Sequence, residues 1–402
     1  MNGYIYPNEA NVVWTVMIVI YPYITGLVAG AFIISALYHV FNQKVFKPVS
    51  KLALVSALSL LLVAPIPLLL HLSQPLRAFN IMLTPNPSSA MAGFGYIYSF
   101  YLMIVLLEIW FIYRKNIVTM AEKSAGLSKI GYGLLSLGAK DLSPGTLAMD
   151  NRIINTLAVI GIPAAFGLHG YVGFIFGGIK ANPWWSSPLM PVIFIASAVV
   201  SGTALLILVY GIGSRLRKRE PDHQCMTALN KYLWIFLIVA VSLEALEIVN
   251  AGYQAKSYWP AVYGLLTQQI PLSFFGIQLL LGGLVPLILL PAARLKSFAR
   301  EWQQRLTMIA AGLIVVGVFA MRWNVVIGGQ LLSKTGMGYS GYVVPLLGRE
   351  GLLMAVVVLI LPIILFSVLS QIFPPWPKDE AAISEQIEVS KSRPELRSGT
   401  VG

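Results

Sequence analysis

The sequence predicts an all-α integral membrane protein with about nine transmembrane helices, within a range of eight to ten. The 402 residues are 57% hydrophobic and only 11% charged, and the mean hydropathy is +0.76. Soluble domains usually carry about 25% charged residues, so this composition excludes an ordinary soluble protein. The net charge of +12 comes from short basic clusters between apolar runs. Such clusters are typical of loops that face anionic membrane lipid, and they do not favour nucleic-acid binding.

Nine apolar segments are long enough to cross a bilayer, which takes about 20 helical residues. Proline and glycine inside several of them are tolerated because neighbouring helices satisfy the freed backbone groups. The stretch WPAVYGLLTQQIP leaves two interpretations open, a loop or a re-entrant or interfacial approach to the seventh helix. The predicted spans are 12–38, 51–71, 92–113, 153–178, 188–211, 232–252, 270–291, 306–329 and 351–373.

Basic residues collect in alternate loops, which predicts an N-terminus outside and a C-terminus inside the membrane. The first of them is Lys44, so no basic region precedes the first apolar run. That run is therefore expected to remain as a helix rather than to be a cleaved signal peptide. The clusters follow the first, third, fifth and seventh spans, and they are Lys44, Lys47 and Lys51; Arg114, Lys115 and Lys123; Arg215, Arg217, Lys218 and Arg219; and Arg294, Lys296 and Arg300.

Three regions are predicted along the sequence. With short loops, the first four spans and the next four share one orientation, which permits two four-helix units. We predict a first helical unit with the ligand pocket at 1–211, and a second unit plus an additional helix at 212–373. Residues 374–402 are expected to be a disordered cytoplasmic tail, because their polar composition cannot form a core. The loop 114–152 is either an amphipathic segment on the inner surface or a plain tether.

The cysteine and histidine content limits the redox groups that the protein can hold. The single cysteine, Cys225, permits no internal disulfide, no iron–sulfur cluster of its own and no covalently attached haem. No two histidines share a helix face at the i, i+3 or i, i+4 spacing, so a metal site has little support. Haem between two histidines also has little support, because His71 and His169 differ in predicted depth by about 10 Å. His39 lies at the other membrane face.

His169 is the polar residue around which the predicted bundle is organised. It lies inside the apolar run GIPAAFGLHGYVGFIFGG, which ends at Lys180, Asn182 and the pair Trp184 and Trp185. We interpret the two tryptophans as ring anchors at a bilayer surface. An ionisable side chain inside a span is costly, so a redox or proton-transfer role is favoured. The alternative is a structural hydrogen bond to a neighbouring helix.

Three more charged residues, Glu244, Glu247 and Arg322, lie at a similar depth in other spans. A helical rise of about 1.5 Å per residue places them about 7 to 12 Å below the outer surface, with His169 at about 13 Å and Tyr23 at about 15 Å. The two carboxylates share a helix face and cannot both be charged unless Arg322 or a proton offsets them. They therefore form either a proton-accepting site or a buried ion pair that joins two helices.

Two further features are interpreted mainly as structural. Glu108 lies at the inner end of the third span and is expected in a surface ion pair with Arg114 or Lys115. The small residues at 26–31 are typical of close helix packing, and alternatively they leave room for a flat ligand beside Tyr23.

A layer of His, Glu, Arg and Tyr side chains near the outer face fits a quinone. The two carbonyl oxygens of a quinone need hydrogen-bond donors, its ring needs an apolar slot, and its two-electron chemistry needs proton acceptors nearby. A proton- or ion-coupled membrane transporter is the alternative function, because charges at mid-membrane and parallel repeats would serve it too. A haem-bearing cytochrome subunit is a third possibility.

Two stretches near the N-terminus resemble a known family. The first span, YPYITGLVAGAF, resembles the glycine and alanine signature of the NrfD/PsrC family, the membrane subunits of polysulfide-reductase-like complexes. The stretch PIPLLLHLSQPLRAFNIMLTPNPSSAMAGFG resembles a helix end followed by the family's LGRPxR and NPxSxMSWG loop. This sequence has His71 where the family usually has Asp, and Ser73 and Gln74 where it has Gly and Arg. Nine spans exceed the eight of shorter members, which indicates a long-form member.

The resemblance implies a quinone-interacting subunit of a respiratory oxidoreductase, active only within its complex, in a bacterial or archaeal cytoplasmic membrane. It would exchange electrons between menaquinone or ubiquinone and an extracytoplasmic ferredoxin-like iron–sulfur subunit, which serves a molybdopterin or multihaem catalytic subunit. The expected quinone-binding residues are Tyr23, His71, His169 and Tyr171 in the first unit. His169, Glu244, Glu247 and Arg322 are the expected catalytic residues, the last three on a proton path. Loops 77–92 and 180–188 are the expected docking surface for the iron–sulfur partner.

Overall fold

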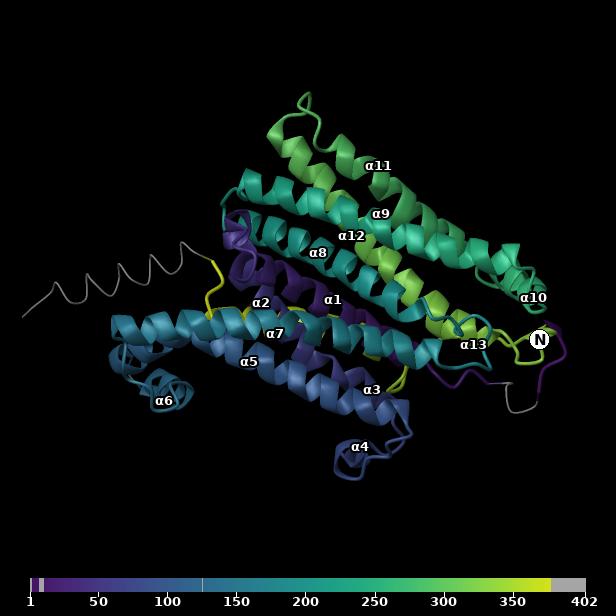
Figure 1. Cartoon of the computed structure of the whole chain (residues 1–402), viewed down its shortest axis with the longest axis horizontal. Coiled ribbons are helices and arrows are strands. Elements are labelled where there is room, and N and C mark those ends of the chain that lie inside the picture. Colours follow the sequence, from purple (N-terminus) through teal and green to yellow (C-terminus); the bar gives the residue numbers. More distant parts are fainter. Residues whose placement is uncertain (1, 7–10, 125, 377–402) are drawn as a thin grey trace, which may run out of the picture.

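The computed structural model describes residues 2–6, 11–124 and 126–376, and it shows a bundle of long helices that lie side by side (Figure 1). Nine helices in this part of the sequence are long and apolar enough to cross a membrane. The protein is therefore a multi-pass, all-α membrane protein, as the composition predicts. A short antiparallel pair, β1 (Asn2–Gly3) with β2 (Gly338–Tyr339), ties the N-terminal segment to the loop before the last span. The predicted tail lies outside the described residues from position 377 onward.

The spans follow the predicted order, and two of them are interrupted. The second span consists of α2 (Lys47–Val63) and α3 (Pro65–His71), separated at the prolines. Two others contain wide π-helical turns. The remaining helices that make up the spans are α1 (Val16–His39), α5 (Ala90–Lys123), α7 (Pro144–Gly177), α8 (Met190–Leu216), α9 (His223–Tyr253), the π-helix η5 (Leu272–Leu284) with α11 (Val285–Ala292), α12 (Arg300–Trp323) with the π-helix η6 (Asn324–Gly328) and α13 (Gly329–Leu331), and α14 (Leu352–Ile372).

The connections between spans carry short helices, and two open interpretations are decided there. The stretch before the seventh span is helical, as α10 (Trp259–Gly264) and η4 (Leu265–Gln269), with Leu265 and Leu266 buried. It is therefore a packed helical approach rather than a loop. The other short helices are η2 (Lys44–Phe46), η3 (Pro75–Arg77), α4 (Asn80–Leu83) and α6 (Gly126–Leu135).

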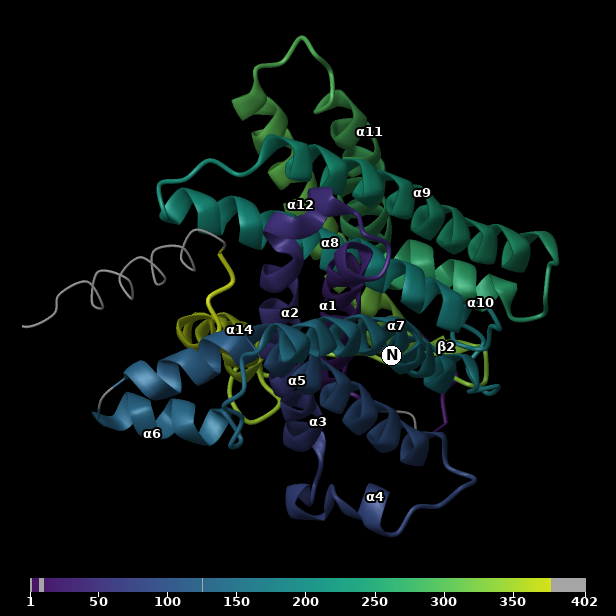
Figure 2. The ribbon, with the colours of Figure 1, turned by 60° about the vertical axis from the view of Figure 1, so that its left-hand side comes forward.

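The loop predicted at 114–152 is largely helical. Helices α5 and α7 have 34 residues each, about 51 Å, which exceeds the roughly 30 Å of a hydrocarbon core. They extend past the membrane, and α6 lies between them, apart from the main bundle (Figure 2). Leu127, Ile130 and Leu134 of α6 are exposed. These apolar side chains favour a segment that lies on the membrane surface over a plain tether.

Helix α1 is the centre of the bundle, because nearly all its residues are buried and it packs on α2, α7, α8 and α12. The small-residue cluster at 26–31 explains this packing. A Cβ at Gly30 would lie 2.1 Å from the Ala198 carbonyl oxygen, so only glycine permits this crossing of α1 and α8. A Cβ at Gly26 would lie 3.2 Å from the His169 ring. The small residues thus leave room for helix α8 and for an imidazole, and not for a flat ligand.

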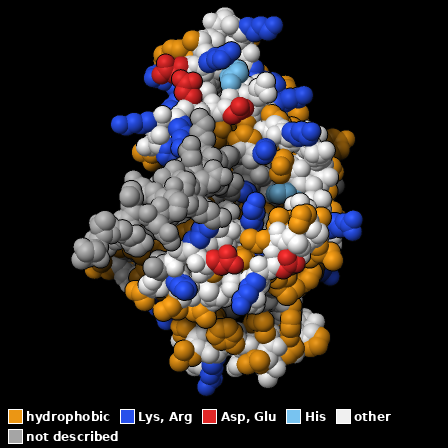
Figure 3. All heavy atoms as spheres, turned by 90° about the vertical axis from the view of Figure 1, so that its left-hand side faces the viewer, with side chains coloured by type: hydrophobic (Ala, Val, Ile, Leu, Met, Phe, Trp, Pro, Cys, Tyr) orange, Lys and Arg blue, Asp and Glu red, His pale blue; other side chains and the backbone are white. Residues whose placement is uncertain are grey.

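The two ends of the bundle differ in charge. The end that carries α6 and the loop between α8 and α9 presents many Lys and Arg side chains (Figure 3). The opposite end carries α10, α13 and the N-terminal segment (Figure 1). This distribution follows the predicted polarity of the protein. The division into units at residue 211 stays a prediction.

Candidate functional site

His169 and Arg322 meet in the middle of the bundle, both fully buried. The Nη2 atom of Arg322 lies 2.9 Å from Nε2 of His169 and donates a hydrogen bond of 2.6 Å to Oγ of Ser197. Because a guanidinium can only donate, His169 accepts at Nε2 and carries its proton on Nδ1. That Nδ1 lies 3.5 Å from Oγ1 of Thr25. The contact joins α1, α7, α8 and α12 at one point.

The environment of Arg322 leaves a buried positive charge without an adjacent carboxylate. Its guanidinium carbon lies 4.0 Å from the ring centroid of Phe194, and Nη1 lies 3.1 Å from the sulfur of Met321. Its Nε has no hydrogen-bond partner among the described residues. A buried cation held only by neutral partners is costly, which indicates a functional use for its charge.

A series of hydrogen bonds leads from the neighbourhood of Arg322 to Glu244. Asn324, two residues after Arg322, donates from Nδ2 to Oε1 of Gln278 at 2.7 Å. Gln278 in turn donates from Nε2 to Oε2 of Glu244 at 2.8 Å. Ser273 donates to Oδ1 of Asn324 at 2.6 Å. We call Glu244, Gln278, Asn324 and Ser273 the polar relay. It connects α9, η5 and η6.

The π-helical turn η6 holds this part of the site in place. A wide turn frees backbone carbonyl groups, and the connection between α7 and α8 supplies donors for them. Trp184 Nε1 donates to the Asn324 carbonyl oxygen at 3.0 Å, and Trp185 Nε1 donates to that of Val325 at 2.6 Å. Asn182 donates to the Gly329 carbonyl at 2.7 Å. The interpretation of Trp185 as a bilayer anchor is wrong, because its side chain is only 6% exposed and binds η6.

A pocket lies beside the polar relay, between α9, α10, η5 and η6. Its polar lining is Glu244, Glu247, Gln278 and Asn324. The cavity volume is about 60 Å³, which is room for a few water molecules. Its walls are largely aromatic, and they include Trp184, Tyr258, Trp259 and Phe274. The pocket combines an apolar slot, amide groups and two carboxyl groups, at the end of the bundle where α10 lies (Figure 1).

The predicted catalytic residues lie along this one region. His169 and Arg322 are in contact, Glu244 belongs to the polar relay, and Glu247 lines the same pocket. The interpretation of the acids and Arg322 as a direct buried ion pair is not what the structure shows, because amide side chains lie between them. Their role in chemistry stays a prediction.

The predicted quinone-binding residues do not meet in one pocket. Nδ1 of His71 lies 3.4 Å from Oε1 of Glu350, and both side chains are partly exposed, by 19% and 24%. Tyr171 packs on α5, where a Cβ at Gly93 would lie 2.4 Å from its hydroxyl. Tyr23 donates to the Val315 carbonyl oxygen at 3.3 Å. Each of these side chains joins two elements of the bundle, and His169 alone of the four reaches Arg322.

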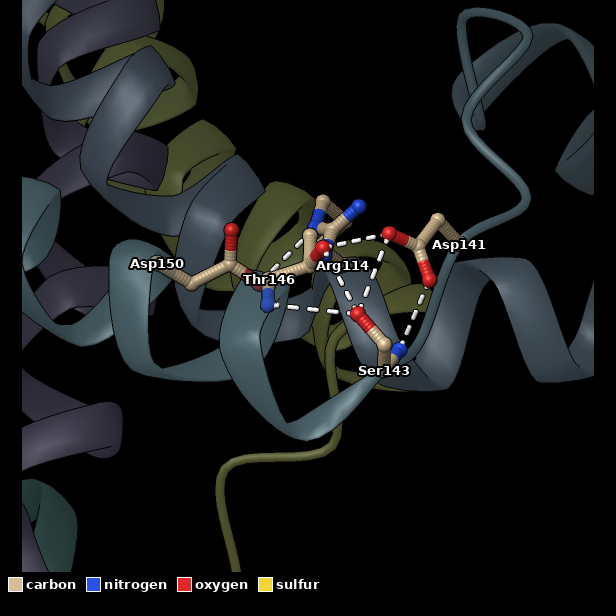
Figure 4. Close-up of polar contacts among 5 residues, drawn as sticks. All are labelled: Arg114, Asp141, Ser143, Thr146 and Asp150. Carbon is tan, nitrogen blue, oxygen red and sulfur yellow. Dashed lines mark hydrogen bonds and ion pairs between the residues drawn. The ribbon is translucent and has the colours of Figure 1, made fainter.

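The position predicted for Glu108 is wrong. Its side chain is fully buried, and neither carboxylate oxygen has a hydrogen-bond partner in the described structure. Arg114 instead pairs with Asp150 of α7, with Nε 2.8 Å from Oδ2 (Figure 4). The error arises because the sequence places Glu108 near the inner surface but does not say which way α5 turns it.

Next to this ion pair, Asp141 fixes the start of α7. It accepts hydrogen bonds from the backbone N–H of Ser143 at 2.8 Å and from Oγ1 of Thr146 at 2.5 Å (Figure 4). These bonds, first that of Thr146 and then those of Ser143, lower the pKa of the exposed Asp141 carboxyl.

Sequence reasoning does not identify Gln278, Ser273, Ser197 and Thr25 as parts of the site. Each is an uncharged polar residue inside an apolar helix, which is the signal that could have identified Gln278 and Ser273. Within residues 2–6, 11–124 and 126–376, no group of three or more His, Cys, Asp or Glu side chains could hold a metal ion. Of the loops predicted to dock a partner, 77–92 exposes the apolar side chains of Phe79 and Leu83, whereas 180–188 is fastened to η6.

Comparison with known proteins identifies relatives for most of the sequence. Residues 6–333 match the family model described as "Polysulphide reductase, NrfD". The protein is 29% identical over 323 residues to a selenate reductase subunit of Mesobacillus selenatarsenatis, covering 78% of this protein and 73% of that one. It is 23% identical to protein NrfD of Escherichia coli, over 80% and 96% of the two proteins. It is 22% identical to a membrane-family relative from Wolinella succinogenes that is named as part of polysulfide reductase, over 80% and 95% of the two proteins.

Proposed function

Because the protein belongs to the NrfD polysulphide-reductase family, we propose that it is the quinone-interacting membrane subunit of an oxidoreductase complex. It exchanges electrons between the quinone pool and an extracytoplasmic iron–sulfur partner, which serves a separate catalytic subunit. The names of the relatives support this proposal, because two of them are parts of a selenate reductase and a polysulfide reductase. The names favour an oxidoreductase subunit over the proton- or ion-coupled transporter that the composition also permits.

The pocket beside the polar relay carries the proposal. A quinone supplies two-electron chemistry that is coupled to two protons. The residues present fit its ring, because Trp184 and Phe274 offer apolar walls. The Gln278 and Asn324 amide nitrogens each have two hydrogens, and the described bonds of the relay use one on each. The second hydrogen of each amide is available for a ring oxygen.

The carboxyl groups suit proton transfer at this place. In the direction of quinol oxidation, Glu244 and Glu247 accept the two ring protons while two electrons pass to the partner; in the opposite direction they donate them. Asn250 and Gln254 continue the same face of α9 outward, and Gln254 donates to Asn250 at 2.9 Å. This line of polar groups leads protons to the outer surface. The nearby charge of Arg322 favours ionised carboxylates.

The size of the pocket sets a condition on entry. Ligand pockets usually have volumes of about 300 to 1,000 Å³, which exceeds the present cavity. The ring therefore enters only when side chains of α10 move outward. Trp259 is the first candidate, because it closes the pocket against Gly252 of α9.

The membrane orientation is part of the proposal. We place the N-terminus and α10 outside, because the basic clusters gather at the opposite end of the bundle. The membrane is then the cytoplasmic membrane of a bacterium or archaeon, with the pocket near its outer surface. Labelling of single cysteines introduced at Lys256 and at Lys129 with an impermeant reagent on whole cells tests this. Labelling at position 129 alone would reverse the orientation.

Substitution of two residues in the assembled complex tests the function. Glu244→Gln and His169→Ala should abolish quinol-linked turnover while the complex still assembles. Glu301→Gln is the matched control, because Glu301 is an exposed acid at the other end of the bundle. Unchanged turnover in both variants would remove the site assignment. Quinone extracted from purified wild-type complex distinguishes this function from transport.

A further inference from the structure

A large apolar chamber lies inside the bundle, away from the polar relay. It is enclosed by α14 on one side and by α8 and α12 on the other, with α1 and α2 beneath. Its volume is about 930 Å³. Leu60, Leu208, Val315 and Phe366 are typical of its apolar lining. We call this space the chamber. Helix α14 follows the stretch that matches the family model, residues 6–333.

The chamber exists because α14 packs on α2 and α1 and stands away from α8 and α12. An apolar space does not retain water, because water finds no hydrogen-bond partners there. Leaving it empty would forfeit dispersion contacts along all the lining side chains. In a membrane, the material available to fill it is hydrocarbon. The length of the chamber and the chemistry of its mouth therefore decide which hydrocarbon fits.

The length of the chamber corresponds to one leaflet. Along α14 its lining runs from Leu359 to Gln371, about 18 Å of helix. Half of a hydrocarbon core is about 15 Å. Its deep end lies at Tyr23, and its other end lies at Arg217 and Trp376 on the basic end of the bundle. The chamber thus has room for acyl tails that enter from the leaflet on that side.

The mouth of the chamber offers donors for an anion. The guanidinium of Arg217 lies 4.5 Å from the Trp376 ring centroid. The Nε1 atom of Trp376 is buried and has no hydrogen-bond partner among the described residues, although the side chain is only 4% exposed. Arg215, Lys218 and Arg219 are next to Arg217 in the sequence. A cation beside an unused N–H donor suits a phosphate group.

We propose that the chamber binds an anionic phospholipid from the leaflet at the basic end of the bundle, with its phosphate at Arg217 and Trp376. Its acyl tails lie along α8, α12 and α14 and fill the space that these helices leave. Basic pockets between transmembrane helices on the cytoplasmic side bind acidic head groups for the same reason. The lipid would hold α14 in place.

Lipid retention by the purified complex tests the proposal. Complex exchanged into micelles that contain phosphatidylglycerol should retain this lipid in native mass spectrometry, and should retain phosphatidylcholine less. Arg217→Gln should lower retention of phosphatidylglycerol roughly fivefold. Trp376→Phe keeps the ring contact and removes the N–H, so it should lower retention by a smaller factor. Arg300→Gln, a basic residue at the same end that does not line the chamber, is the control.

A second variant covers the case in which Arg217→Gln does not fold. Ile363→Trp places a larger side chain in the chamber without changing the mouth, and it should also lower lipid retention. The proposal is overturned if both variants retain as much phosphatidylglycerol as wild type, if both lipids are retained equally, or if extraction yields quinone rather than phospholipid from this site. These outcomes do not depend on quinol-linked turnover, so they leave the proposed function separately testable.

Discussion

Two glutamates inside the bundle, Glu244 in α9 and Glu108 in α5, have opposite surroundings. Glu244 is partly buried, accepts a hydrogen bond from Gln278 and lines a pocket. Glu108 is fully buried, and neither of its oxygens has a partner in the described structure. Tyr101, two turns earlier on α5, also has an unpaired hydroxyl. The same residue type is thus placed once in a hydrogen-bonded network and once in apolar packing.

The difference indicates two protonation states. A carboxylate without donors in hydrocarbon is far more costly than a neutral carboxylic acid, so Glu108 is expected to hold its proton. Glu244 has an amide donor and the charge of Arg322 nearby, so it can ionise and can exchange protons. A buried acid becomes useful for proton transfer only where other residues stabilise its charged form. The predictions below are arranged to break or sharpen this contrast.

The largest effect is expected at Arg322, the charge that supports Glu244. Arg322→Leu should lower quinol-linked turnover by about a hundredfold or more, as loss of a proton-transfer group does. Arg322→Lys should not restore it, because one guanidinium nitrogen reaches both His169 and Ser197. Turnover of the assembled complex measures this. Full activity in the lysine variant would show that charge alone is sufficient.

The next effect concerns the proton on Glu108. Glu108→Gln replaces a neutral acid by a neutral amide of similar shape, so the free energy of unfolding should change by no more than about 1 kcal/mol. Glu108→Lys places a charge there and should destabilise the protein by about 3 kcal/mol. Thermal unfolding in detergent measures both. Equal losses in the two variants would mean that Glu108 is ionised and has a partner.

Infrared spectroscopy addresses the same proton directly. Wild-type protein at neutral pH should show the C=O stretching band of a protonated carboxylic acid, and Glu108→Gln should remove it. Glu244→Gln serves as the comparison and should leave that band in place. A band that disappears only in Glu244→Gln would reverse the assignment of the two acids.

A smaller effect is expected where the π-turn η6 is held. Trp185→Phe keeps the ring and removes the donor to the Val325 carbonyl oxygen. The loss should be about 1 kcal/mol of unfolding free energy, the usual contribution of one hydrogen bond. Trp302→Phe, at an exposed position, is the control. No difference between the two variants would show that this bond does not stabilise η6.

The smallest effect is expected at Asp141, an acid in water. Its pKa is lowered in the folded protein, so its hydrogen bonds to Thr146 and Ser143 stabilise the fold above its ordinary pKa. That contribution is lost as the pH falls through the lowered value. Asp141→Asn should therefore have a slightly lower melting temperature than wild type at pH 7, and the gap should close near pH 3. A gap independent of pH would exclude this explanation.

Parts of the site can be predicted from the sequence because depth follows from sequence position. Helical rise gives His169, Glu244 and Arg322 a common level, and in the structure His169 and Arg322 are in contact. Rise says nothing about the direction in which a side chain points around its helix. For this reason the sequence predicts Glu108 at the surface with Arg114, and Trp185 in lipid, and both predictions are wrong. The partner of Arg114, Asp150, lies 36 positions further along the sequence.

The sequence alone determined that this is a membrane protein of nine spans that belongs to the NrfD family. Hydrocarbon requires about 20 consecutive apolar residues for each crossing, and this requirement is local in the sequence. Only the tertiary structure decided which polar groups meet. The polar relay joins α9, η5 and η6, and the chamber joins helices from both halves of the protein. Such contacts depend on how each helix is rotated against its neighbours, and that rotation is set by close approaches such as that of Gly30 to α8.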